Sequence, residues 1–232
     1  MIFILIAYFW GGIPTAYILG KRMFGLNILH VGSGNSGATN LMFQTNFFVG
    51  IIGGAIDVFI KGVFPVLFIK YLVPGNDLLH YMFGIFLLIG HNWSPYIKFR
   101  GGRGIAIFMG ILFALGWMEA VLVLIFIQGL NYLVSFTINK NYFEPSFWII
   151  IWFGYLLFTL FFYNYEIDVK FFISISVLVI LIKRITANFE PLPKNITFYR
   201  SLVFRLFLDR DILKKNLWVG RKNFFSDKKN SK

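Results

Sequence analysis

Cysteine is absent from this sequence, and it has only 3 histidines and 10 acidic residues among 232. Without cysteine the chain can form neither a disulfide nor a thiolate nucleophile. The histidines, His30, His80 and His91, lack the spacing of a zinc cluster. We therefore expect no metal and no other cofactor, a carboxylate-rich site being the one alternative. The G-x-x-x-x-G-K-[ST] loop, the H-E-x-x-H zinc motif and the G-x-S-x-G elbow of serine hydrolases are missing too.

Hydrophobic residues are abundant instead. They make up 58% of the chain, with a mean hydropathy of +0.72, whereas soluble domains usually contain about 45–50%. A soluble fold of this length buries only part of its surface and could not cover so many apolar side chains. The composition therefore predicts an all-α polytopic membrane protein, in which lipid covers the apolar helix faces.

Seven apolar segments are predicted to form transmembrane helices, each of which needs about 20 apolar residues. They are residues 2–20, 47–72, 79–91, 104–117, 119–138, 147–163 and 170–186. The first is expected to be a retained helix, because it lacks the basic start and the small-residue cleavage site of a signal peptide. The third and fourth are short and flank a polar stretch, so their ends are expected to lie below the membrane surface.

The distribution of charge predicts the orientation, because cytoplasmic loops are enriched in Lys and Arg. If the N-terminus is outside, the basic residues at 21–22, 98–103 and 140 and those of the C-terminal tail all lie inside. The outside loops then carry Asp77, Glu119, Glu166 and Asp168, with Lys170 as the one basic exception. We therefore expect a multi-pass protein of the cell membrane with its N-terminus outside and its C-terminus in the cytoplasm.

Two domains are expected, a transmembrane domain at 1–187 and a basic cytoplasmic tail at 188–232. Of the 22 Lys and Arg residues, 13 lie from Lys183 onward, which contributes strongly to the net charge of +12. Leucines at near-helical spacing favour an amphipathic segment on the membrane surface, and a solvated tail is the alternative. The positive-inside rule already explains this charge, so we expect no nucleic-acid partner.

Two glycine-rich stretches fall on the predicted cytoplasmic face, "GSGNSGATN" at 32–40 and "GHNWSPYIKFRGGRG" at 90–104. Glycine lets a ligand approach the main chain closely. Successive N–H groups form a concave nest for anions, and a helix that begins after such a loop adds its positive end. Arg100 and Arg103 add guanidinium groups suited to phosphate. The stretches predict a phosphate site, although glycines that only permit helix packing are the alternative.

Asp57 and Lys61 stand inside the second predicted helix. Charged residues in hydrocarbon are costly and usually face the protein interior. At i, i+4 the two side chains share a helix face, so we interpret them as a buried structural pair. His91, at a helix end, is interpreted first as a hydrogen-bonded packing residue and second as a base.

At these stretches the sequence resembles the bacterial membrane glycerol-3-phosphate acyltransferases that use acyl-phosphate donors, the PlsY family. Gly32–Asn40 matches the first family motif, G-S-G-N-x-G-A-T-N, at every position. The second stretch resembles G-H-x-x-P-x-x-x-x-F-x-G-G-K-G-V-A-T, with its proline one place later, at Pro95. A D-x-x-K-G element is echoed by Asp57, Lys61 and Gly62 with one extra residue. The resemblance spans roughly 4–184.

The sequence departs from the family pattern in several places. Arg103 stands where the family has Lys, Phe43 where it has an arginine, and Ile107 where it has a threonine. The third motif, H-R-x-N-I-x-R-L-L-x-G-x-E, is only partly recognisable. Its matches are Arg184 and Asn188 in "KRITAN" and, after an insertion, Arg205 and Asp211 in "RLFLDRD".

The resemblance implies seven helices, with the active site facing the cytoplasm. It implies transfer of an acyl group from acyl-phosphate to the sn-1 hydroxyl of glycerol 3-phosphate, with membrane lipid around the acyl chain. On this basis we expect Ser33, His91, Arg103 and Asn188 to be the catalytic residues. The residues expected to bind phosphate are Gly32, Gly34, Asn35, Gly37, Thr39, Asn40, Gly101, Gly102, Gly104 and Arg184.

Two other classes of function are consistent with the sequence. A transporter of a phosphorylated solute also has glycine-rich breaks near helix ends, but it needs access from both sides and commonly has inverted repeats, which we do not find. A catalytically degenerate relative that binds lipid is the other alternative, and the departures at Phe43, Arg103 and the third motif favour it somewhat.

Overall fold

The computed structural model describes residues 1–137, 145–189, 197–211, 213, 218 and 220. The part of the chain so described is all helical, as expected. Its α-helices are α1 (Ile2–Gly12), α2 (Thr15–Phe24), α3 (Ala38–Gln44), α4 (Phe47–Ala55), α5 (Phe64–Leu72), α6 (Asp77–Asn92), α7 (Ile105–Ala114), α8 (Met118–Thr137), α9 (Pro145–Phe162), α10 (Ile167–Thr186) and α11 (Phe198–Leu208). Short 3-10 helices lie at Ile28–His30, Pro95–Ile97 and Ala187–Phe189, and a π-helix lies at Ile56–Val63.

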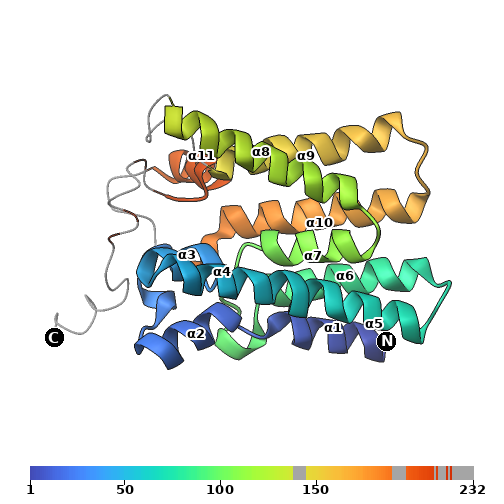
Figure 1. Ribbon diagram of the computed structural model, residues 1–232, viewed down its shortest axis with the longest axis horizontal. Coiled ribbons are helices and arrows are strands. Elements are labelled where there is room, and N and C mark those ends of the chain that lie inside the picture. Colours follow the sequence, from blue (N-terminus) through green and yellow to red (C-terminus); the bar gives the residue numbers. More distant parts are fainter. Residues whose placement is uncertain (138–144, 190–196, 212, 214–217, 219, 221–232) are drawn as a thin grey trace.

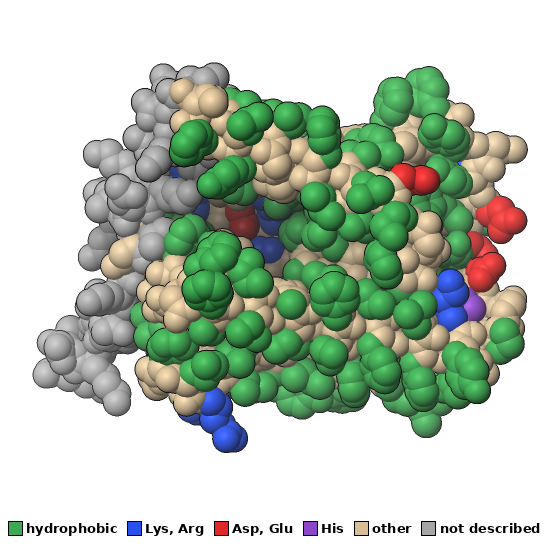
Figure 2. Space-filling model, in the orientation of Figure 1, with side chains coloured by type: hydrophobic (Ala, Val, Ile, Leu, Met, Phe, Trp, Pro, Cys, Tyr) green, Lys and Arg blue, Asp and Glu red, His purple; other side chains and the backbone are tan. Residues whose placement is uncertain are grey.

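The long helices run side by side along the longest axis of the molecule (Figure 1). Four helical stretches of the described chain are long and apolar enough to cross a membrane: Ile2–Phe24, Phe47–Leu72, Met118–Thr137 and Pro145–Phe162. α7 has only 10 residues, fewer than the roughly 20 that span a bilayer. Hydrophobic side chains cover most of the visible flank (Figure 2), as expected for a surface in contact with lipid.

The first predicted helix is divided in two, because Pro14 follows Ile13. A residue before proline is disfavoured in the α conformation, and Ile13 has φ −55° and ψ 117°, outside it. The carbonyl of Ile13 accepts a hydrogen bond from Lys61 Nζ at 2.7 Å. The charged side chain inside the second span therefore satisfies the backbone exposed by the break in the first.

The second predicted span continues from α4 through the π-helix to α5. A π-helix has i→i+5 hydrogen bonds and accommodates one additional residue without ending the helix. This is where the chain has an extra residue between Asp57 and Lys61, and both side chains are buried. The insertion is therefore absorbed by a local change of helix type, which keeps the acidic and basic groups together.

Glycines allow the helices to cross at very short distances. A Cβ atom on Gly11 of α1 would lie 2.0 Å from the Leu87 carbonyl oxygen, and one on Gly90 of α6 would lie 2.0 Å from that of Tyr8. At a second crossing, a Cβ on Gly110 of α7 would lie 2.1 Å from the Val58 carbonyl oxygen of the π-helix. Small residues at helix interfaces in membranes permit such close approach of backbones.

The segment after α10 packs on the bundle where it is described. α11 contacts α9 and α10, and its side chains Ser201 and Arg205 are buried. Arg205 Nη1 donates to the Ile185 carbonyl oxygen at 3.3 Å. The remainder of the predicted tail, apart from residues 188–189, 197, 209–211, 213, 218 and 220, lies outside the described residues.

We predict that Gly11→Ala lowers the midpoint of thermal unfolding in detergent. The added methyl group would overlap Leu87, and overpacking of this kind costs about 1–3 kcal/mol. Gly154→Ala is the control, because nothing lies within 4 Å of its added Cβ, and it should leave the midpoint unchanged or raise it slightly. Tryptophan fluorescence of the purified protein during heating measures both. Equal midpoints would contradict the close crossing of α1 and α6.

Candidate functional site

The two glycine-rich stretches meet at the side chain of Asn188, which follows α10. Its Nδ2 donates to the carbonyl oxygens of Gly34, at 3.2 Å, and Gly101, at 3.1 Å. Its Oδ1 accepts from the Gly101 N–H at 3.1 Å and from Lys183 Nζ. Asn188 has φ +58°, a left-handed conformation that asparagine tolerates better than most residues. One buried carboxamide thus ties together segments that are far apart in the sequence.

The first stretch is shaped from within by Asn40, in the first turn of α3. Its Oδ1 accepts from the Ser33 N–H at 3.1 Å. Its Nδ2 lies 2.9 Å from the Ile28 carbonyl oxygen and 3.0 Å from that of Asn35. Gly32 has φ +58°, and a Cβ there would lie 2.4 Å from Asn40 Oδ1. Asn40 therefore sets the course of the loop that presents Ser33.

The glycines of the second stretch are packed against the end of α6. The Gly101 N–H is bound by Asn188, and the Gly102 N–H donates to the His91 carbonyl oxygen at 3.1 Å. A Cβ on Gly101 would lie 2.1 Å from the same oxygen, and one on Gly102 would lie 2.2 Å from His91 Nε2. These two N–H groups form hydrogen bonds within the protein. The group that this stretch contributes to the cavity is therefore the side chain of Arg103.

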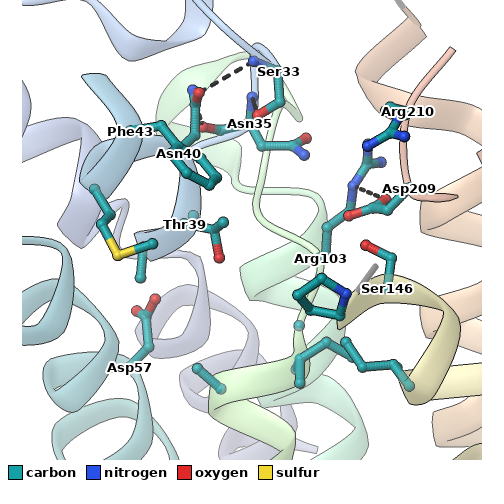
Figure 3. A pocket seen from close by; sticks show the side chains of 18 of the residues that line it. Ser33, Asn35, Thr39, Asn40, Phe43, Asp57, Arg103, Ser146, Asp209 and Arg210 are labelled. Atoms are coloured by element: carbon teal, nitrogen blue, oxygen red, sulfur yellow. Dashed lines mark hydrogen bonds and ion pairs between the residues drawn. The ribbon is translucent and has the colours of Figure 1, made fainter. Parts of the chain in front are cut away.

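A cavity of about 420 Å³ lies where the two stretches meet. Figure 3 shows Ser33, Asn35 and Thr39 on one side of it and Arg103, Ser146, Asp209 and Arg210 on the other. In Figure 2 charged side chains are visible in a hollow between hydrophobic ones. The apolar part of its wall comes from α3, α7, α9 and α11 and includes Met42, Phe43, Ile105, Met109, Ile149 and Leu208. The site therefore combines polar groups with an apolar wall.

Arg103 is held by contacts with three different segments. Nη1 donates to the Lys183 carbonyl oxygen at 2.8 Å. Nε lies 2.7 Å from Asp209 Oδ1. When the Asn35 carboxamide turns its oxygen toward Arg103, that oxygen accepts from Nε at 2.9 Å and from Nη2 at 3.2 Å. The guanidinium is thus oriented at the edge of the cavity, with its side chain 11% exposed.

A buried network of charged and polar groups forms the floor of the cavity. Lys61 Nζ lies 3.2 Å from Asp57 Oδ1 and 3.0 Å from His91 Nδ1. Thr15 Oγ1 donates to the same Asp57 oxygen at 2.7 Å. With Lys61 Nζ as the donor, His91 Nδ1 is the acceptor, and the other ring nitrogen, Nε2, lies beside Gly102. Asp57 and His91 line the cavity, and Lys61 lies behind them.

The structure brings most of the residues predicted from the sequence to this cavity. Those that line it are Ser33, Asn35, Gly37, Thr39, Asn40, Asp57, His91, Arg103 and Gly104. The others support this lining from behind: Gly32, Gly34, Lys61, Gly101, Gly102, Arg184 and Asn188. Arg184, for example, donates from Nη2 to the Ser146 carbonyl oxygen at 2.9 Å.

Sequence reasoning did not identify Ser146, Asp209 and Arg210 as site residues. Ser146 is in the first turn of α9 and has no motif around it. Asp209 and Arg210 are part of "RLFLDRD", in which the resemblance to the third family motif points only to Arg205 and Asp211. Their place depends on the packing of α11 against α9 and α10, for which the sequence contains no local signal. In the described part of the chain no group of three or more His, Asp or Glu residues is placed to hold a metal ion.

The family model described as glycerol-3-phosphate acyltransferase matches residues 1–194. Glycerol-3-phosphate acyltransferase 2 of Moorella thermoacetica is 38% identical over 112 residues, which are 48% of this chain and 56% of that protein. Glycerol-3-phosphate acyltransferase of Thermotoga petrophila is 38% identical over 120 residues, 52% of this chain and 60% of that protein. The chain therefore spans little more than half the length of these relatives.

Two crystal structures of PlsY (YgiH), described as an integral membrane glycerol 3-phosphate acyltransferase, resemble the fold. The glycerol 3-phosphate form has a TM-score of 0.66 at 23% identity, and the lysophosphatidic acid form a TM-score of 0.65 at 22% identity. Each alignment covers 79% of this chain and 86% of the other. The fold is therefore that of a membrane-embedded, multi-pass helical protein.

We predict that Asn188→Ala loosens both glycine-rich stretches together. Loss of the side chain leaves buried backbone groups of Gly34 and Gly101 without partners, which costs about 1–3 kcal/mol for each group. Deuterium uptake should rise in peptides covering 32–40 and 99–104. Asn131→Ala is the control, because Asn131 is a buried asparagine of α8 that is not part of this cavity lining. Unchanged uptake in both stretches of the Asn188 variant would contradict the linking role.

Proposed function

Because the chain belongs to the glycerol-3-phosphate acyltransferase family, we propose that it transfers a fatty acyl group from acyl-phosphate to the sn-1 hydroxyl of glycerol 3-phosphate. The products are lysophosphatidate and inorganic phosphate. The observation that best supports this proposal is that the Gly32–Asn40 stretch and Arg103 meet at one cavity, which also has an apolar wall. Such a cavity suits a substrate pair with phosphate groups at one end and an acyl chain at the other.

The reaction requires little covalent chemistry from the protein. Acyl-phosphate is a mixed anhydride, so its carbonyl carbon is already activated. The acceptor hydroxyl attacks this carbon, the bond to the phosphate oxygen breaks, and the departing phosphate can take the hydroxyl proton. Holding two reactants in this geometry contributes up to about 7–11 kcal/mol to catalysis. Neither a protein nucleophile nor a metal is needed for these steps.

The described contacts support distinct roles for the residues at the cavity. The Ser33 hydroxyl, presented by the loop that Asn40 shapes, would donate to the acyl-phosphate. Arg103, oriented by the Lys183 carbonyl oxygen, would bind a phosphate group of the acceptor or of the donor. The acyl chain would lie along Met42, Met109 and Ile149, toward the lipid.

We also propose seven membrane crossings, with the N-terminus outside and the site facing the cytoplasm. Acidic side chains gather at the end of the molecule opposite α3 and α11 (Figures 1 and 2). Three of the four acidic residues assigned to the outside lie in first turns of helices, Asp77 of α6, Glu119 of α8 and Asp168 of α10. An acidic outer end agrees with the positive-inside distribution of the basic residues.

The orientation can be measured with single cysteines, since the chain has none of its own. Asp77→Cys and Lys21→Cys both introduce a thiol at an exposed position. A maleimide that does not cross membranes should label the thiol at position 77 in intact cells and the one at position 21 only after permeabilisation. The reverse pattern, or equal labelling of both in intact cells, would refute this topology.

The activity is tested in membranes with palmitoyl-phosphate and labelled glycerol 3-phosphate. Arg103→Ala should lower turnover by about 10²–10³-fold, the typical loss when one donor to a developing anion is removed. Ser33→Ala should lower it by at least about tenfold for the same reason. Arg22→Ala is the charge-matched control, because Arg22 is exposed on α2. Near wild-type rates for both site variants would end this assignment.

The identity of the donor is tested in the same assay by replacing palmitoyl-phosphate with palmitoyl-coenzyme A or palmitoyl-acyl carrier protein. We expect turnover with the phosphate donor alone, because the cavity supplies groups for a small anion rather than for a large carrier.

A further inference from the structure

The carboxylate of Asp209 lies between two guanidinium groups at the edge of the cavity. Its Oδ1 is 2.7 Å from Arg103 Nε and 3.8 Å from Arg184 Nε. Arg184 is 1% exposed, and its Nη1 has no hydrogen-bond partner among the described residues. Two arginines converging on one oxyanion form the arrangement in which proteins commonly bind carboxylate or phosphate. Here the anion is supplied by the chain itself.

The backbone of Asp209 also has a conformation that is unusual for a residue other than glycine. It is the residue after α11 and has φ +54° and ψ +30°, the left-handed conformation in which glycine is usual at a helix end. A side chain other than glycine in this conformation is worth examining for a function. Its side chain is 20% exposed and lines the cavity (Figure 3), while Oδ1 itself is buried against the arginines. An incoming ligand can therefore reach the side chain.

Asp209 is not needed to orient Arg103. The guanidinium is held independently by the Lys183 carbonyl oxygen at 2.8 Å. Asp209 Oδ1 lies close to Nε but accepts no hydrogen bond among the described residues, and in the orientation that turns the Asn35 oxygen toward Arg103 this oxygen accepts from Nε at 2.9 Å. Removing the carboxylate therefore leaves the hydrogen bonds of Arg103 in place. The carboxylate instead neutralises positive charge that a phosphate group would use.

We propose that Asp209 sets the affinity of the site for phosphate by acting as an internal competitor at Arg103. The carboxylate pairs with Arg103 when the cavity holds no phosphate and gives up this position when a phosphate monoester or acyl-phosphate binds. This inference rests on the proposed function for the identity of the ligand. Asp209 is thus a specificity-determining residue, which favours ligands able to bind Arg103 more strongly than a single carboxylate does.

The first test is binding of inorganic phosphate and of glycerol 3-phosphate to the full chain in detergent, measured by calorimetry without an acyl donor. Asp209→Asn should bind both about tenfold more tightly than the wild type, about 1.4 kcal/mol. Asp209→Gly, which suits the left-handed backbone and also removes the charge, should do the same. Asp77→Asn is the charge-matched control and should bind like the wild type, because Asp77 is exposed at the start of α6. Unchanged or weaker binding by both Asp209 variants would overturn the proposal.

A double variant separates competition at Arg103 from a general effect of charge. In the Arg103→Ala background, Asp209→Asn should give no gain in phosphate affinity, because the guanidinium for which the carboxylate and the phosphate compete is gone. An equal gain in both backgrounds would overturn the proposal.

Turnover identifies which phosphate is involved. For Asp209→Asn the KM should fall for glycerol 3-phosphate if the acceptor's phosphate binds Arg103, or for palmitoyl-phosphate if the donor's does, with kcat not reduced. A reduced kcat at unchanged KM for both substrates would show that Asp209 positions Arg103 and would overturn the competitor role. Because the binding arm uses no acyl donor, it remains decisive if no turnover is found, whereas that result would count against the proposed function alone.

Discussion

The side chain of Asn188 makes the contact on which the site depends. It satisfies backbone groups of Gly34 and Gly101, in two stretches that come from opposite sides of the cavity. At membrane depth, irregular backbone is tolerated only where it is buried in protein or lines a wet cavity, because lipid offers no hydrogen bonds. The carboxamide supplies both donors and an acceptor in one small group. The two loops can therefore remain irregular, and so present Ser33 and Arg103, while these backbone groups of Gly34 and Gly101 are paired.

The same constraint explains the buried charges beneath the cavity. Asp57 and Lys61 are both almost fully buried, at 1% and 2% exposure, and each neutralises the other. Lys61 also satisfies the Ile13 carbonyl at the helix break and contacts His91. A buried pair of this kind is weak as a source of stability but strong as a constraint on geometry, because removal of either partner leaves an uncompensated charge. The network thus links the broken first span to the floor of the site.

The charged residues around the cavity show how neighbouring side chains of the same chain can adjust the affinity of a site for anions. Arg103 and Arg210 share the lining with Asp209, whereas Asp57 is already paired with Lys61. A lining in which a carboxylate lies beside the arginines binds a phosphate group only through well-oriented donors. This is consistent with the number of contacts that fix Arg103 in place.

The sequence by itself determined the all-helical membrane fold, the approximate helix positions and the two polar stretches, because these depend on composition and on local runs of residues. The motif residues Ser33 and Arg103 could be selected in the same way. Only the tertiary structure decided that the N–H groups of Gly101 and Gly102 are used within the protein, that a π-helix accommodates the extra residue between Asp57 and Lys61, and that Asp209 reaches the cavity. The first and the last of these follow from contacts between segments distant in the chain. Such contacts are set by packing, which no local pattern of residues encodes.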